Sequence, residues 1–205
     1  MSLATLPPQR IGVFGGAFDP PHVAHVALAR AAIAQLQLDA LHIIPTGHAW
    51  HKTRTLSPAV HRLAMTRLTF AGVDKVVVDP RETQRSGPSY TVDTLEALRA
   101  EHPAAQFFLI VGEDQAQSLG TWHRWQDVLQ LAIICVAARA GFTRASPLFE
   151  ALHLAPTAFQ LIEMPPMDVS ATDIRLRVAN HQSTDALVFE PVARYIDHHH
   201  LYQTA

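Results

Sequence analysis

The sequence has only one cysteine, Cys135, and lacks lysine- or arginine-rich runs, internal repeats and low-complexity segments. A single cysteine cannot form an internal disulfide, so we expect a reducing compartment and a buried thiol within the apolar run around it. No apolar stretch reaches the roughly 18 residues that span a bilayer, and residues 1–10 lack the apolar core of a signal peptide. These absences predict a cytoplasmic protein without a membrane partner.

Charge is also sparse. Charged residues make up 17% of the chain, and the formal net charge is −2. Binding to a nucleic-acid backbone needs a basic face, so this balance argues against a nucleic-acid partner. The 205 residues, 48% of them apolar, suit one globular domain over residues 1–205, with a tail of residues 1–9. The sequence does not distinguish a monomer from a homo-oligomer.

Short apolar runs alternate with helical patterns along the whole chain. The runs predict strands at residues 11–14, 40–45, 75–78, 106–112, 132–137 and 159–164. Helices are expected after the first run, from Ser57 as N-cap, from about 89 to 102, at 147–154 and from about Pro191. This alternation predicts an α/β fold with a doubly wound parallel sheet of Rossmann type.

The richest stretch, residues 15–25, has the sequence GGAFDPPHVAH and connects the first strand to the first helix. Glycines allow a sharp turn close to a ligand, and a helix amino terminus offers free N–H groups to anions. His22 and His25 lie one helical turn apart, so both imidazoles are expected to donate to one phosphate chain. Either histidine alone is better explained as a cap or a half-buried core residue.

This stretch closely resembles the Gly-Gly-x-Phe-Asp-Pro-x-His-x-Gly-His motif of nucleotidylyltransferases, specifically the bacterial nicotinate-nucleotide adenylyltransferases. Ala24 replaces the usual glycine. The resemblance implies catalytic roles for His22 and His25 and ATP or phosphate binding by Gly15, Gly16 and Phe18.

The polar loop at residues 46–55 follows the second strand, where it is expected to reach the ligand crevice. Lys52 is a candidate phosphate contact, and His51-Lys52 matches the His-Lys pair of the family. His48 and His51 also have a spacing seen in metal sites, but no cysteine or nearby carboxylate completes a ligand set. No protein metal site is therefore predicted.

Two further stretches match family segments for the acceptor nucleotide. Residues 89–95, SYTVDTL, would be ordinary helix capping without the resemblance, which implies that Ser89, Tyr90 and Thr91 contact the mononucleotide. Trp122 resembles the ring that stacks on the pyridine, and N–H groups around His123 would then meet its carboxylate. Trp125 is expected to be the core anchor of the tryptophan pair.

Two more candidates follow later strands. Asp114 is expected to hold ribose hydroxyls in the ATP site, beside Glu113, where the family often has alanine. Residues 169–175, VSATDIR, match the Ile-Ser-Ser-Thr-x-x-Arg motif, with Ala171 in place of the second serine. Ser170 and Asp173 form a capping-box pattern. The match implies triphosphate binding by Ser170 and Thr172 and a catalytic role for Arg175.

The resemblance covers essentially the whole chain. It implies AMP transfer from ATP to nicotinate mononucleotide, with Mg²⁺ brought by ATP. Nicotinamide mononucleotide or phosphopantetheine are alternative acceptors, and a dual-specificity enzyme or a non-catalytic nucleotide sensor are alternative functions. A Rossmann dehydrogenase is rejected because the glycines do not form Gly-x-Gly-x-x-Gly and hydride transfer has no use for the histidine pair.

Overall fold

The computed structural model describes residues 7–47, 55–138 and 159–203. It contains a six-stranded sheet in the order β3-β2-β1-β4-β5-β6, and every pairing is parallel. The strands are β1 (Arg10–Gly16), β2 (Ala40–Pro45), β3 (Val76–Val78), β4 (Gln106–Gly112), β5 (Ile133–Ala138) and β6 (Phe159–Glu163). This order confirms the predicted doubly wound α/β sheet. The strands that follow β1 lie on one side of it up to β3, and those from β4 onward lie on the other side. Ligands bind at this switch point between β1 and β4 in folds of this kind.

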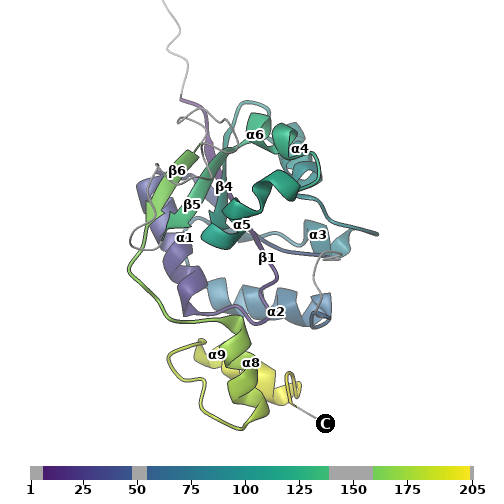
Figure 1. Ribbon diagram of the computed structural model, residues 1–205, viewed down its shortest axis with the longest axis vertical. Helices are drawn as coiled ribbons and strands as arrows, with labels where there is room; N and C mark the ends of the chain where they lie inside the picture. Colours follow the sequence, from purple (N-terminus) through teal and green to yellow (C-terminus); the bar gives the residue numbers. More distant parts are fainter. Residues whose placement is uncertain (1–6, 48–54, 139–158, 204–205) are drawn as a thin grey trace, which may run out of the picture.

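Helices cover both faces of the sheet (Figure 1). They are α1 (Val23–Gln35), α2 (Ala59–Phe70), α3 (Arg81–Gln84), α4 (Thr91–Glu101), α5 (Glu113–Gln117), α6 (Trp125–Leu131), α8 (Ala171–Ala179) and α9 (Glu190–His198), with the 3₁₀ helix η1 at Leu119–Thr121. Side chains alternate along a strand, so β4 serves two cores. Phe107 and Leu109 pack with α4 and α6, whereas Phe108 and Ile110 pack with α1.

The C-terminal helices α8 and α9 form a smaller layer beside α2, away from most of the sheet (Figure 1). A third core joins them, built from Met65 of α2 and the buried residues Ile174, Val192 and Ile196. We call residues 170–202 the C-terminal segment. Its position beside α2 brings residues near the C-terminus close to the turn that follows β1.

Several local predictions agree with the structure, and others are wrong. The bounds of β2 and β4 are as predicted. The stretch 79–89, for which the sequence predicts neither a strand nor a helix, contains α3, a single turn too short to show a period of its own. The helix predicted from Ser57 begins at Ala59, with Pro58 as N-cap residue. The predicted helix at 147–154 lies outside the described residues.

Cys135 is fully buried in β5, as predicted. Burial raises the pKa of its thiol to about 12, so the thiol stays protonated and serves packing. Within the described ranges, no helix has both the length and the apolar character needed to cross a membrane.

Candidate active site

The candidate site begins where β1 ends, at the edge of the sheet where the topology reverses. We call residues 15–22 the phosphate turn. Phe18 within it has a positive φ of 47°, and its ring folds back into the core, only 2% exposed. A Cβ on Gly16 would come within 3.0 Å of this ring, so the fold-back requires glycine there. The ring of Phe18 therefore anchors the turn in the core, so only the backbone of Phe18 could make the predicted contact with ATP.

His22 and His25 come together as predicted. Their rings stack with centroids 3.7 Å apart and planes at 27°. The backbone N–H of His22 donates to Nδ1 of His25 at 3.0 Å. Because Nδ1 of His25 accepts this bond, the neutral ring must carry its proton on Nε2. The fold thereby selects the tautomer of His25 and leaves Nε2–H as its donor.

Both imidazoles are neutral near pH 7. Burial lowers the pKa of His22 to about 4. Burial, and secondarily the neighbouring His22, lower the pKa of His25 well below its ordinary value. Nδ1 of His22 is buried and has no hydrogen-bond partner among the described residues. A buried polar atom without a partner is costly, so this atom marks a place where a ligand would be stabilised.

The prediction of free N–H groups at the start of α1 is wrong for two of them. The N–H of Val23 donates to the carbonyl of Leu187 at 3.0 Å, and that of His25 donates to the carbonyl of His22 at 3.0 Å. The Leu187 contact comes from the loop between α8 and α9, which no local pattern could reveal. The predicted anion binding at this end of α1 would therefore depend more on the imidazoles than on the backbone.

Arg175 reaches the phosphate turn from α8. Its Nη1 donates to the carbonyl of Asp19 at 2.7 Å, and its Nη2 donates to Oγ1 of Thr172 at 3.0 Å. The Oγ of Ser170 caps α8 by accepting from the N–H of Asp173 at 3.1 Å, as predicted. The carboxylate of Asp173 instead pairs with Arg177, so the capping box is only half formed.

The predicted acceptor residues gather around the start of α4. Tyr90 stacks on His123 with centroids 4.3 Å apart, and both Tyr90 and Trp122 pack against the core of that face. Thr91 is the first residue of α4. The Oγ of Ser89 is buried without a hydrogen-bond partner among the described residues.

Two details of the tryptophan loop correct the prediction. Trp122, and not Trp125, is the member of the pair that packs against the core. Trp125 begins α6 and, like Trp122, is half-buried. The N–H of Trp122 already donates to the carbonyl of Leu119 at 3.0 Å, so it is not available to a pyridine carboxylate.

The remaining predicted residues lie at the same edge or outside the described ranges. Asp114 is exposed in the first turn of α5, directly after β4. Lys52, His48 and His51 lie outside the described residues.

Three residues that sequence reasoning did not assign organise this edge. Arg62 of α2 is 2% exposed and donates to the carbonyls of Ser57, Ala17 and Gly47 at 2.9, 3.0 and 3.3 Å. It thereby ties the loops that follow β1 and β2. Arg62 shares the buried face of α2 with Met65, Thr66, Thr69 and Phe70, so its helical spacing from Met65 and Phe70 was the available signal for it. Asp19 and Tyr202 are the other two, and the hydroxyl of Tyr202 donates to Oδ1 of Asp19 at 2.6 Å.

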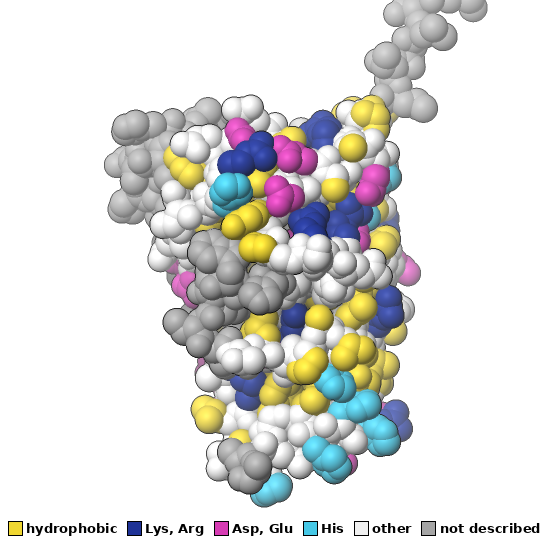
Figure 2. All heavy atoms as spheres, turned by 90° about the vertical axis from the view of Figure 1, so that its right-hand side faces the viewer, with side chains coloured by type: hydrophobic (Ala, Val, Ile, Leu, Met, Phe, Trp, Pro, Cys, Tyr) yellow, Lys and Arg dark blue, Asp and Glu magenta, His cyan; other side chains and the backbone are white. Residues whose placement is uncertain are grey.

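Other polar features lie elsewhere. Figure 2 shows histidines gathered low on the molecule, over the C-terminal helices, where the rings of His61, Tyr195 and His199 are in contact. Throughout the part of the chain that the structure describes, no group of three histidine, cysteine or acidic residues could hold a metal ion.

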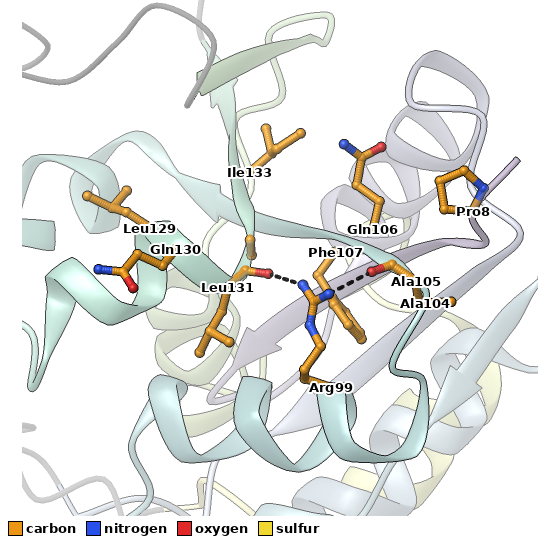
Figure 3. Close-up of a pocket in the computed structure, with 11 residues that line it drawn as sticks. Pro8, Arg99, Ala104, Ala105, Gln106, Phe107, Leu129, Gln130, Leu131 and Ile133 are labelled. Atoms are coloured by element: carbon orange, nitrogen blue, oxygen red, sulfur yellow. Dashed lines mark hydrogen bonds between the residues drawn. The ribbon is translucent and has the colours of Figure 1, made fainter.

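A hollow also lies at the amino ends of β4 and β5, opposite the candidate site (Figure 3). Arg99 beside it donates to the carbonyls of Ala105 and Leu131 at 3.1 and 3.0 Å, and covers the ring of Phe107. These contacts give that arginine a structural role.

A doubly wound parallel sheet, with a glycine turn and paired neutral histidines at its switch point, defines a nucleotide-binding α/β protein equipped to handle phosphates. The family model described as cytidylyltransferase-like matches residues 13–177. The probable nicotinate-nucleotide adenylyltransferase of Albidiferax ferrireducens is 65% identical over 197 residues, covering 96% of this chain and 100% of that protein. That of Methylibium petroleiphilum is 42% identical, covering 96% and 93%.

Solved structures agree on the fold. Nicotinic acid mononucleotide adenylyltransferase from Plasmodium falciparum, complexed with NaAD, has a TM-score of 0.76 at 19% identity, covering 95% of this chain and 97% of that one. A Vibrio parahaemolyticus nicotinate-nucleotide adenylyltransferase structure has a TM-score of 0.68 at 14% identity, covering 96% and 97%. The chain belongs to the cytidylyltransferase-like family and, within it, to the nicotinate-nucleotide adenylyltransferases.

Proposed function

We propose that the protein transfers AMP from ATP to nicotinate mononucleotide, giving nicotinate adenine dinucleotide and pyrophosphate in NAD synthesis. The His22–His25 pair carries the proposal. Both imidazoles are neutral and lie at the switch point; the tautomer of His25 is fixed, and Nδ1 of His22 is buried without a partner among the described residues. Relatives at up to 65% identity are named for this activity. A cytoplasmic location fits the single buried cysteine thiol.

In the proposed reaction, a phosphate oxygen of the mononucleotide attacks the α-phosphorus of ATP. The new P–O bond forms as the bond to pyrophosphate breaks, so no covalent enzyme intermediate is needed. Negative charge grows on the phosphate oxygens, and donors already in place stabilise it. His22, His25 and Arg175 are the described donors, and Lys52 is proposed as another.

The other predicted ATP contacts fit supporting roles around these donors. Gly15, Gly16 and the backbone of Phe18 would let the triphosphate lie close to the turn, while Ser170 and Thr172 would meet it from the start of α8. Asp114, exposed at the end of β4, would accept from ribose hydroxyls. Arg175 contacts both the turn and Thr172, which supports a shared phosphate site.

The acceptor would lie between the start of α4 and the tryptophan loop. Trp122 and Tyr90 offer ring faces for a cationic pyridine, and the buried Oγ of Ser89 offers a partner for the acceptor's polar groups. Since the N–H of Trp122 is already bonded, we assign the pyridine carboxylate to the N–H of His123. Thr91 would contribute its hydroxyl from the first turn of α4.

A divalent cation, Mg²⁺ in our proposal, would arrive with ATP and neutralise charge on its phosphates. Mg²⁺ is usually held through substrate phosphates and keeps several waters, which fits a phosphate site built from donors and not from carboxylates. We expect excess chelator to abolish turnover and added Mg²⁺ to restore it. Full turnover in chelator would remove the ion from the mechanism, and tightly bound zinc in the purified protein would revive a site at His48 and His51.

A coupled pyrophosphate-release assay tests the proposal directly. The wild-type protein is given ATP with nicotinate mononucleotide, nicotinamide mononucleotide or phosphopantetheine, and product is identified by mass. We expect nicotinate adenine dinucleotide from the first acceptor. ATP binding without pyrophosphate release from any acceptor would instead indicate a nucleotide sensor.

A further inference from the structure

The C-terminal segment holds the phosphate turn and the start of α1 at three points. Arg175 donates to the carbonyl of Asp19, and the carbonyl of Leu187 accepts from the N–H of Val23. The third contact comes three residues before the end of the sequence, where the hydroxyl of Tyr202 donates to Oδ1 of Asp19 at 2.6 Å. Residues more than 150 positions apart in sequence thus meet at the turn that precedes His22.

Asp19 is the centre of these contacts. It is 2% exposed, and its second carboxylate oxygen, Oδ2, accepts from the N–H of Ser57 at 3.1 Å. A buried carboxylate is costly unless it is hydrogen-bonded, and two donors on its two oxygens also fix its rotation. The carboxylate therefore joins the phosphate turn, the start of α2 and the end of the chain.

Tyr202 is built into this position. Its ring packs with the third core, and its hydroxyl lies 3.9 Å from the sulfur of Met65. Its backbone φ of 64° is in the left-handed region, which a bulky side chain rarely adopts. Burial and the neighbouring Asp19 raise the pKa of Tyr202, so its hydroxyl remains a donor.

We infer that Tyr202 is a positioning residue of the active site, which fixes the Asp19 carboxylate and through it the orientation of the phosphate turn and its histidines. This inference rests on the proposed function. Only two prolines separate Asp19 from His22, and each proline fixes its own φ. A change in the backbone orientation of Asp19 is therefore passed on to His22 through a stiff connection. Without the hydroxyl, we expect the turn to sample orientations in which the histidines are misplaced for phosphoryl transfer.

The test is Tyr202→Phe, which keeps the ring and removes only the hydroxyl. Tyr195→Phe is the matched control, because Tyr195 belongs to the same C-terminal segment and bonds through its hydroxyl to Nδ1 of His61 at 3.1 Å, not to the turn. We expect kcat to fall about tenfold in Tyr202→Phe, with KM for both substrates changed less than about twofold. Tyr195→Phe should keep the wild-type kcat.

Two measurements separate positioning from simple stabilisation. Thermal unfolding should show a lower midpoint for Tyr202→Phe than for Tyr195→Phe, because the buried Asp19 carboxylate loses a donor, with both variants still folded at the assay temperature. Hydrogen exchange of the peptide covering residues 14–25 should become faster in Tyr202→Phe alone. A wild-type kcat and unchanged exchange in Tyr202→Phe would overturn the inference, as would equal effects of both substitutions. The exchange measurement needs no substrate, so it still decides the inference if the wild-type protein fails to turn over and the proposed function is wrong.

Discussion

The two halves of the candidate site are built differently. On the phosphate side, directed hydrogen bonds from several distant segments converge on Asp19 and on the histidines that follow it. On the acceptor side, ring contacts dominate: Tyr90 stacks on His123, and Tyr90 and Trp122 both pack against the same core. Hydrogen bonds depend strongly on distance and angle, whereas flat rings tolerate sliding.

This difference fits the two tasks of the proposed reaction. Charge that develops on phosphate oxygens must be met by donors held in place before the reaction occurs. A pyridine ring needs a face to stack on and a single well-placed donor to identify its substituent. The comparison predicts that the phosphate side sets the rate and the acceptor side sets the choice of substrate.

The largest expected effect is the choice between acceptors in the wild-type protein. The pyridine carboxylate would accept a charge-assisted bond from the N–H of His123, while a carboxamide would bring NH₂ donors against it. We expect kcat/KM to favour nicotinate mononucleotide over nicotinamide mononucleotide by up to ~10⁴-fold. Comparable kcat/KM values in competition assays would indicate a dual-specificity or nicotinamide-type enzyme.

The second effect is on stability and belongs to the phosphate side. The pKa of His22 falls from 6.5 to about 4 on folding, so the unfolded chain takes up the proton first as the pH drops. Stability should therefore be complete above pH 6.5 and be lost towards pH 4, by about 3 kcal/mol for this shift. Urea unfolding between pH 7.5 and 4.5 should show that the free energy of unfolding falls less steeply with pH in His22→Gln than in the wild type. Equal dependence on pH in the two proteins would show that His22 is not the cause.

The third effect is on rate. His25→Ala removes the Nε2–H donor that the structure holds in one tautomer, and we expect kcat to fall about a hundredfold or more. The variant should still fold, with some loss of stability because the His25 ring packs against Phe14 and Phe18, so kcat is measured on protein shown to be folded. His198→Ala, on the exposed end of α9, is the control with wild-type kcat. Near-normal turnover by folded His25→Ala would exclude the catalytic role.

The smallest effect is expected on the acceptor side. Trp122→Ala should raise KM for both mononucleotides by about tenfold, because stacking treats the two pyridines alike. The preference for nicotinate should largely survive, since the donor is separate. Trp125→Ala is the matched control, because Trp125 lies three residues away and outside the core. If Trp122→Ala also abolished the preference for nicotinate, stacking and recognition of the carboxylate would not be separate contacts.

Much of this architecture was predictable from local patterns. Continuous apolar runs predicted β2 and β4 with their observed bounds, because strands buried on both faces must be apolar throughout. The glycine turn, the histidine pair and the Ser170 cap depend on neighbours within a few residues, and all three formed. The resemblance to a known family then supplied roles for residues such as Ser89 and Trp122 that composition alone would leave as caps and core.

Other features were beyond local reasoning. The sequence shows that His22 and His25 share a helix face, but the tautomer of His25 depends on a backbone bond that only the folded turn makes. Trp122, and not Trp125, packs against the core, and the residues between η1 and α6 show no periodicity that would distinguish the two rings.

By itself, therefore, the sequence determined the doubly wound sheet and the family, because these follow from periodicity and short motifs, and it named the residues proposed to carry the chemistry. Only the tertiary structure decided which donors remain available and what holds them. The carbonyl of Leu187 accepts a hydrogen bond from the first N–H of α1, and Arg62 donates to carbonyls in two different loops. The hydroxyl of Tyr202 donates to the carboxylate of Asp19. Each of these contacts joins segments far apart in the chain, and a hydrogen bond of that kind exists only after packing has brought its two ends together.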